Sequence, residues 1–153
     1  MPSISIVSDL TTHTGYRMRM VSNHVSHAFA AKLTDKEVTV AEWTVLRTLY
    51  GNEPTSPSQL AYDMGMTRGA ITKLADRLIA KSLIIREASV NDGRAQTLAL
   101  TDRGIGLVPD LAALADRNDA DCFECLTGDE RETLRRLLKK MTERARITAI
   151  PIA

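Results

Sequence analysis

The residues of this chain that are best suited to chemistry are cationic and hydroxyl-bearing side chains near its middle. Seven basic and four acidic residues lie between Thr67 and Arg103, so this segment carries a charge of +3. Because all 153 residues together carry only +1, the remainder of the chain carries −2. A basic segment in a nearly neutral chain is typical of a module that contacts phosphate groups. The predicted chemistry is therefore binding to nucleic acid.

The strongest candidates share one face of a helix that we expect to begin after Thr67. Its apolar residues recur at helical spacing and predict a buried side, formed by Ile71, Leu74, Ala75 and Leu78. The opposite side carries groups that can reach base edges or phosphates in a major groove, namely Arg68, Gly69, Thr72 and Lys73, with Arg77 at its flank. Gly69 would let the helix approach DNA closely. The alternative interpretation is a solvated polar face.

A second short helix precedes this one and carries its own polar start. Ser56 can cap it, Pro57 suits its first position, and Gln59 is placed to complete a capping box. The free amides and the side chains of Ser56, Ser58 and Gln59 would suit phosphate. Gly65 ends this helix, and Thr67 caps the next one. Two short helices joined through a glycine indicate a helix-turn-helix, although an ordinary helical hairpin has the same spacing.

A β-hairpin follows directly and favours the DNA-binding interpretation. The apolar, β-branched run Leu83–Arg86 predicts a strand, Asn91–Gly93 predicts a turn, and Ala95–Leu100 predicts the returning strand. A hairpin directly after a helix-turn-helix is the layout of a winged helix. Arg94 at the tip could enter a minor groove, and Asp92 could orient an arginine as well as form the turn. Arg86 at the base is a candidate phosphate contact.

Long helices flank this unit on both sides. We expect a first helix from about Leu10 to Leu33 and a second that starts with the capping box Thr39–Glu42 and ends at Gly51. A fifth helix is capped by Thr101, contains Pro109 as a kink, and has inward residues Ile105, Val108, Leu111, Leu114 and Ala115. A sixth starts with the box Thr127–Glu130, ends near Arg146 and is expected to bury Leu134, Leu137, Leu138 and Met141. The tail, residues 147–153, is apolar, which predicts that something covers it.

From about Leu33 to Met141 the chain resembles the multiple-antibiotic-resistance regulator (MarR) family. The most specific likeness is Asp92-Gly93-Arg94-Ala95 followed by Leu100-Thr101, which matches the family's wing. Supporting segments are Ser58–Ala61, Thr67–Leu74, Asp76-Arg77-Leu78 and Leu126-Thr127 before Glu130. The helix that begins after Thr67 corresponds to the family's recognition helix, which enters the major groove. This chain departs from the family pattern at Lys81-Ser82, where relatives commonly have glycine, so the backbone that leaves the recognition helix is expected to be strained.

The resemblance implies a mainly α fold with a small β wing, a winged helix-turn-helix with N- and C-terminal dimerisation helices. We expect one unit over residues 1–153, with a DNA-binding lobe at about 36–101 and dimerisation helices at about 1–35 and 102–153. The implied function is that of a ligand-responsive repressor, a homodimer that binds a palindromic site in double-stranded DNA. The sequence does not choose between repression and activation. The alternatives are a winged-helix module that binds protein, and a thiol- or metal-sensing regulator on the same fold.

The resemblance also implies a pocket for a small aromatic or anionic effector. On the first two helices, Arg17 could pair with a carboxylate, Met20 could fill space, and His24 and Trp43 could line the pocket. The simpler interpretation is that Trp43 is a core residue and Arg17 a solvated one.

The histidine pair and the cysteine pair give weaker evidence for a functional site. His24 and His27 share a helical face without further metal ligands nearby, so no metal is expected. Cys122 and Cys125 have acidic neighbours, which disfavour a reactive thiolate. We expect no catalytic site, no cofactor and no membrane segment, and cytoplasmic localisation.

Overall fold

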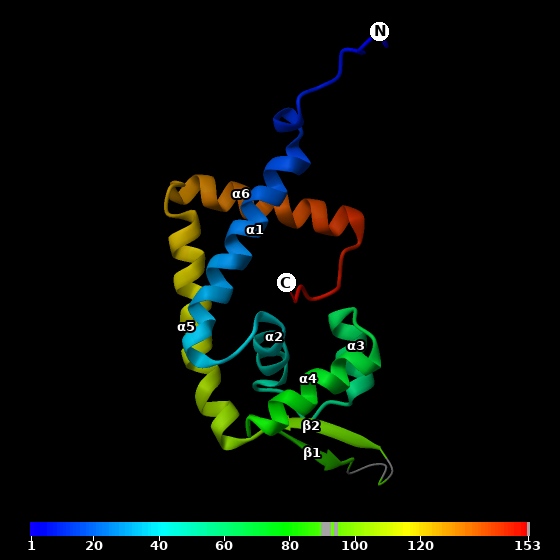
Figure 1. Ribbon diagram of the computed structural model, residues 1–153. Helices are drawn as coiled ribbons and strands as arrows, with labels where there is room; N and C mark the ends of the chain where they lie inside the picture. The colour runs from blue at the N-terminus through cyan, green and yellow to red at the C-terminus, as the bar shows by residue number, and fades with distance from the viewer. Residues whose placement is uncertain (90–92, 94, 153) are drawn as a thin grey trace.

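The computed structural model describes residues 1–89, 93 and 95–152, and it is mainly α-helical with a single hairpin among them. Helices and strands follow in the order η1 Leu10–Thr12, α1 Thr14–Leu33, η2 Thr34–Lys36, α2 Val40–Leu49, α3 Pro57–Met64, α4 Arg68–Ala80, β1 Ile84–Ala88, β2 Gln96–Leu100, α5 Asp102–Phe123 and α6 Gly128–Ala145. Figure 1 shows α2, α3, α4 and the hairpin gathered at one end of the long helices α1 and α5. We call this group, residues 38–100, the lobe.

Hydroxyl caps set the starts of the helices as predicted. The side chains of Thr39, Ser56, Thr67, Thr101 and Thr127 each accept a hydrogen bond from the backbone N–H three residues later. The boxes Thr39–Glu42 and Thr127–Glu130 are complete. The box expected from Gln59 is wrong, because its Nε2 donates to Asp63 Oδ1 at 2.8 Å instead of reaching back to Ser56. Helix α1 starts at Thr14, after the separate turn η1, rather than at Leu10.

The core of the lobe forms where the predicted apolar faces meet. Ile71, Leu74, Ala75 and Leu78 of α4 are all buried, as expected. They join residues from every neighbouring element in one cluster, which includes Leu46, Leu60, Leu98 and Leu111 at 0% exposure. Burial of this apolar surface is the main stabilising contribution to the lobe.

The hairpin pairs β1 with β2 in antiparallel register from Ile84↔Leu100 to Ala88↔Gln96. Both strands are shifted slightly from the predicted runs. Thr55 adds a short third edge that sequence reasoning missed. The Thr55 N–H donates to the Leu98 carbonyl at 3.0 Å, and the Thr55 carbonyl accepts from the Leu98 N–H at 2.8 Å. The start of α3 is thereby attached to the base of the wing.

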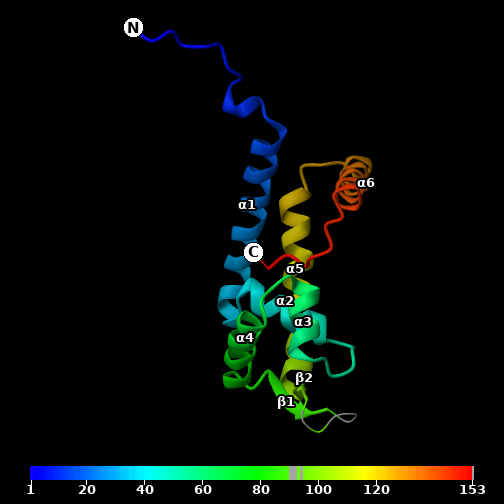
Figure 2. The same ribbon diagram turned by 90° about the vertical axis from the view of Figure 1, so that its right-hand side faces the viewer.

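Helices α1 and α5 lie side by side in both views (Figures 1 and 2). Asn118 on α5 is 4% exposed, accepts from Lys32 Nζ at 3.0 Å and donates to the Val25 carbonyl at 3.2 Å. Such a buried, satisfied amide fixes the register between two helices. Helix α5 continues through Pro109, which removes one hydrogen bond without ending the helix.

Helix α6 differs from the prediction. Leu137, Leu138 and Met141 are 43%, 40% and 49% exposed, and α6 has no buried residue. Ile105 of α5, also expected inward, is 48% exposed. Figure 2 shows α6 apart from α1 and from the lobe, and within the described residues of one chain its apolar side is only partly covered. The burial expected for these residues is wrong for one chain.

The apolar tail after α6 folds back onto the lobe of its own chain. Ile150 and Ile152 pack against the core cluster, and the Ile150 N–H donates to the Asp63 carbonyl at 3.2 Å. The tail also passes Gly65, where φ is +62° and an added Cβ would lie 2.9 Å from Ala149 Cβ. The cover expected for the apolar tail is therefore provided by the lobe of the same chain. None of the helices in the described ranges is long and apolar enough to cross a membrane.

Candidate nucleic-acid interface

The outer face of α4 is exposed along its length. Arg68, Gly69, Thr72, Lys73 and Arg77 are all solvent-exposed, opposite the buried side of the helix. A Cβ added at Gly69 would meet nothing within 4 Å, so this position lies on an open surface. The Thr72 hydroxyl donates to the Arg68 carbonyl at 3.0 Å, which leaves its oxygen free to accept only. The face therefore offers cations as its main donors.

The start of α3 lies in the same lobe and presents the expected polar groups. Ser58 and Gln59 are exposed, while Ser56 is half-buried and its Oγ accepts from the Gln59 N–H at 3.1 Å. Thr67 is exposed and likewise accepts from Ala70 N–H at 3.1 Å. Ser56 and Thr67 thus serve first as helix caps, whereas Ser58 is the hydroxyl in this set without such a task.

An ion pair links the wing to α4. Arg86 on β1 donates to Asp76 on the outer face of α4 at 2.5 Å, and both side chains are partly exposed. Sequence reasoning placed Arg86 as a phosphate contact and gave Asp76 no role. The spacing of ten residues across a helix and a strand carries no pattern from which the pair could be read. The pair fixes the base of the wing against the recognition helix and holds Arg86 near it. Asp92 and Arg94, the predicted wing-tip residues, lie outside the described residues.

The exit from α4 is strained in the way the sequence indicated. Ser82 has φ +61°, a left-handed conformation that favours glycine. Its carbonyl accepts from Thr101 Oγ1 at 2.7 Å, and Gly104 packs so closely that an added Cβ would lie 2.2 Å from the Leu83 carbonyl oxygen. The chain therefore leaves the recognition helix in a conformation that α5 supports.

Of the residues predicted for an effector pocket, the structure places only Trp43 beside a cavity. Trp43 packs edge-on against Phe29 of α1, with ring centroids 6.2 Å apart, and it lines a cavity of about 530 Å³. Arg17, Met20 and His24 are exposed on α1. Arg17 precedes Phe29 by twelve residues, or about 18 Å along a helix, so one chain does not bring Arg17 to Trp43. The cation at this cavity is instead Arg47, and the tail residues Ile150 and Pro151 form another wall.

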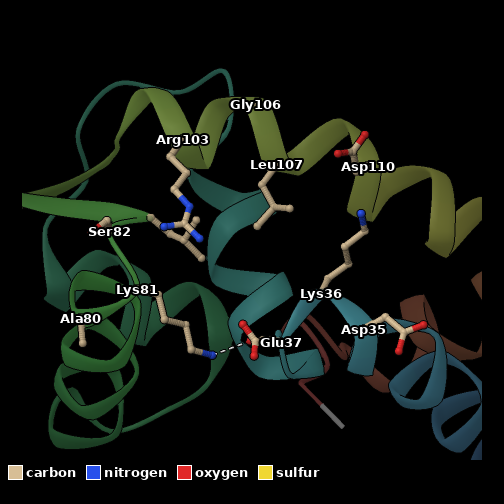
Figure 3. Close-up of a pocket in the computed structure, with 11 residues that line it drawn as sticks. Asp35, Lys36, Glu37, Ala80, Lys81, Ser82, Arg103, Gly106, Leu107 and Asp110 are labelled. Carbon is tan, nitrogen blue, oxygen red and sulfur yellow. Dashed lines mark hydrogen bonds between the residues drawn. The ribbon is translucent and has the colours of Figure 1, made fainter.

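A second cavity, of about 560 Å³, lies between the turn η2, the end of α4 and the first turns of α5. Figure 3 shows Arg103 and Leu107 reaching into it from α5, opposite Lys36 and Glu37. Its charged residues are of both signs, so the cavity does not select one charge of ligand.

The histidine and cysteine pairs do not join a larger cluster of metal-ligating side chains among the described residues. Within the described residues no group of three metal-ligating side chains comes together. Both cysteines are free: Cys122 is half-buried beside Asn118 Oδ1 at 3.8 Å, and Cys125 is exposed beyond the end of α5.

A helix-turn-helix whose second helix exposes a basic face, followed by a hairpin joined to that helix, defines the winged-helix class of DNA-binding proteins. The comparisons with known proteins agree. The model of the MarR family matches residues 38–95, which span the lobe from α2 into the wing. A protein of Thauera aromatica, named for transcriptional regulation of the hcr operon, is 31% identical over 128 residues, or 83% of this chain and 77% of its own length.

Solved structures show the same likeness. A single-site variant of MarR from E. coli, complexed with operator DNA, has 27% identity and a TM-score of 0.75 over 83% of this chain and 91% of that one. A MarR family protein of Mycobacterium tuberculosis, complexed with salicylic acid, has 27% identity and a TM-score of 0.68 over 84% and 96%. The chain belongs to the MarR family of transcriptional regulators.

Proposed function

We propose that the protein is a ligand-responsive repressor that binds a palindromic operator as a homodimer in the cytoplasm. The single observation that carries DNA contact is the exposed basic face of α4, a helix whose opposite side is buried in the core of the lobe. Arg68 and Lys73 would reach guanine acceptors or phosphates, and Thr72 would accept from a base. Ser58, Gln59, Arg77 and Arg86 would contact phosphates, with Arg94 in the minor groove and Asp92 orienting an arginine.

The exposed apolar side of α6 supports the dimer. Leu134, Leu137, Leu138 and Met141 lie on one side of α6, and the exposed Met18 and Val21 form a separate apolar surface on α1. Two copies related by a two-fold axis would bury both surfaces at once. Residues 36–101 would then act as the DNA-binding lobe, with 1–35 and 102–153 as dimerisation segments. Two linked lobes predict half-sites about one helical turn apart.

The test of DNA binding is selection of bound duplexes from a random pool, followed by affinity measurements on the enriched site. We expect a palindrome, and we expect Arg68→Ala and Lys73→Ala each to weaken binding. Each lost base contact should cost about 1–3 kcal/mol of binding free energy. Failure to enrich any sequence, with no salt-dependent binding to bulk duplex DNA, would favour the protein-interaction module instead.

The effector is proposed to be a small aromatic acid held at the Trp43 cavity. The relative from M. tuberculosis is complexed with salicylic acid, and this chain places Arg47 beside Trp43 at a cavity of about 530 Å³. The aromatic ring would pack on Trp43 and the carboxylate would pair with Arg47. Binding would shift the population of lobe positions and release DNA.

Titration of salicylate into the protein–operator complex tests the effector class and its site together. We expect release of DNA, reduced in Trp43→Ala and Arg47→Ala. Arg17→Ala removes the same charge from an exposed position on α1. This variant distinguishes the Trp43–Arg47 site from the pocket predicted by sequence, which included Arg17, Met20 and His24. If salicylate no longer releases DNA from Arg17→Ala but still releases it from Arg47→Ala, the effector site is the one predicted by sequence.

A further inference from the structure

Besides the apolar packing of its buried side, the recognition helix α4 is joined to its neighbours by one lysine at its C-terminal end. Lys81 follows α4 directly, and its Nζ lies 2.8 and 3.2 Å from the two carboxylate oxygens of Glu42 and 2.6 Å from the Glu37 carbonyl oxygen. An ammonium group has three donors, and three acceptors surround this one. Lys81 thereby joins α4 to the start of α2 and to the connection between α1 and α2.

Glu42 is suited to hold such a link because its own helix start also holds the carboxylate in place. It is only 1% exposed, and Oε1 also accepts from the Thr39 N–H at 3.1 Å as part of the capping box. Burial raises the pKa of Glu42, but the hydrogen bonds from Lys81 and Thr39 outweigh burial, so the pKa lies below its ordinary value. The buried carboxylate is therefore charged at neutral pH and requires its cation.

The backbone on both sides of this contact is strained. Among the described residues, the non-glycine residues with positive φ are Glu37, Ser82 and Arg146, and two of these adjoin the Lys81 contact. Glu37, with φ +57°, presents the carbonyl that Lys81 binds, and Ser82, with φ +61°, follows Lys81. Left-handed conformations in residues with side chains cost free energy and persist where the surroundings hold them. Here the surroundings are the contacts of Lys81 and of Thr101.

The contacts of Lys81 lie at the edge of a cavity. The cavity of about 560 Å³ lies beside it, and Figure 3 shows Lys81 and Glu37 facing each other across the gap between α4 and the α1–α2 connection. Beside this cavity, the polar contacts of Lys81 add to the packing of the apolar side of α4. An apolar pair would hold two elements together as strongly as a buried ion pair, but with a less specific geometry.

We propose that Lys81 is a positioning residue for DNA recognition, which fixes the orientation of α4 relative to α1 and α2 and so the spacing of two recognition helices in a dimer. The inference rests on the proposed function, because it needs a DNA-bound dimer. It predicts that loss of Lys81 impairs the choice between operators of different spacing more than it impairs contact with DNA.

The test compares affinity for the selected operator with affinity for the same operator carrying one extra base pair at its centre. For Lys81→Met we expect the ratio of the two affinities to fall by about tenfold, in the range of ordinary coupling between linked sites. Lys81→Arg keeps the charge and should restore most of the ratio. Lys36→Met is the matched control, since Lys36 is exposed on the same connection and forms no ion pair with any described residue.

A purely structural role would lower the folded fraction and weaken both operators equally, leaving the ratio unchanged. An unchanged ratio in folded Lys81→Met protein therefore overturns the inference alone. If Lys81→Met does not fold because Glu42 is left buried and unpaired, the double variant Lys81→Met with Glu42→Leu removes both charges, and the same fall in ratio is expected. If the unaltered protein binds no DNA, the proposed function falls and this inference falls with it.

Discussion

The lobe and helix α6 carry the same kind of apolar periodicity, but only the lobe buries it. Leu46, Leu60 and Leu98 are completely buried, whereas Leu137, Leu138 and Met141 on α6 are 43%, 40% and 49% exposed. Apolar residues at helical spacing predict that one side of a helix will be covered, but they do not identify what covers it. In the lobe the cover is the chain itself, and on α6 we propose that it is a second copy.

The largest effect expected from this contrast is on stability. Leu60→Ala should lower the free energy of unfolding by about 2–5 kcal/mol, because it opens a cavity in a packed core. Leu137→Ala, measured by urea denaturation at concentrations too low for association, should cost less than about 0.5 kcal/mol, as for a surface position. Similar losses for both variants would show that α6 is covered within one chain.

Association should show the opposite preference. Leu138→Glu places a charge on the proposed interface and should raise the dimer dissociation constant at least about tenfold, as expected for a central interface residue. Sedimentation equilibrium measures this directly. A variant that remains as dimeric as the unaltered protein would remove α6 from the interface.

Substituting the exposed cations of α4 is expected to change the affinity for DNA and to leave the stability of the fold unchanged. Lys73→Ala should reduce the slope of log affinity against log salt by about 1, because one fewer counterion is released. Filter binding or fluorescence anisotropy at several salt concentrations provides the slope. Lys36→Ala removes the same charge away from this face and should leave the slope unchanged; equal effects would mean that net charge alone governs binding.

The smallest predicted effect concerns pH. The pKa of Glu42 is lowered from its ordinary value of 4.5 in the folded chain, so the unfolded chain takes up this proton first as the pH falls. The stability that Glu42 contributes is therefore present above pH 4.5 and is lost as the pH falls through the lowered folded value. Unfolding followed between neutral and acid pH should show this loss, and Glu42→Gln should show a shallower dependence. A dependence that is unchanged in the variant would assign the loss to other carboxylates.

Much of the fold could be predicted because its determinants are local. Caps such as Thr39 and Thr67 act within three residues, and the buried face of α4 follows from its period. The Arg86–Asp76 and Lys81–Glu42 pairs could not be predicted, because they join residues 10 and 39 positions apart that only the packed elements bring together. The sequence named Trp43 for an effector pocket, which stays a prediction, and in the structure Trp43 lines a cavity. Its cation is Arg47 and not Arg17, because cavity walls depend on how α1, α2 and the tail pack.

The central claim is that two copies of this chain bind one operator together, and the mass of the complex tests it most directly. Native mass spectrometry of the protein bound to its selected duplex should give two chains per duplex, with Leu138→Glu shifting the complex toward free chains and DNA. The account predicts that the duplex is a palindrome with half-sites about one helical turn apart. A stable complex of one chain per duplex on a site without two-fold symmetry would contradict it.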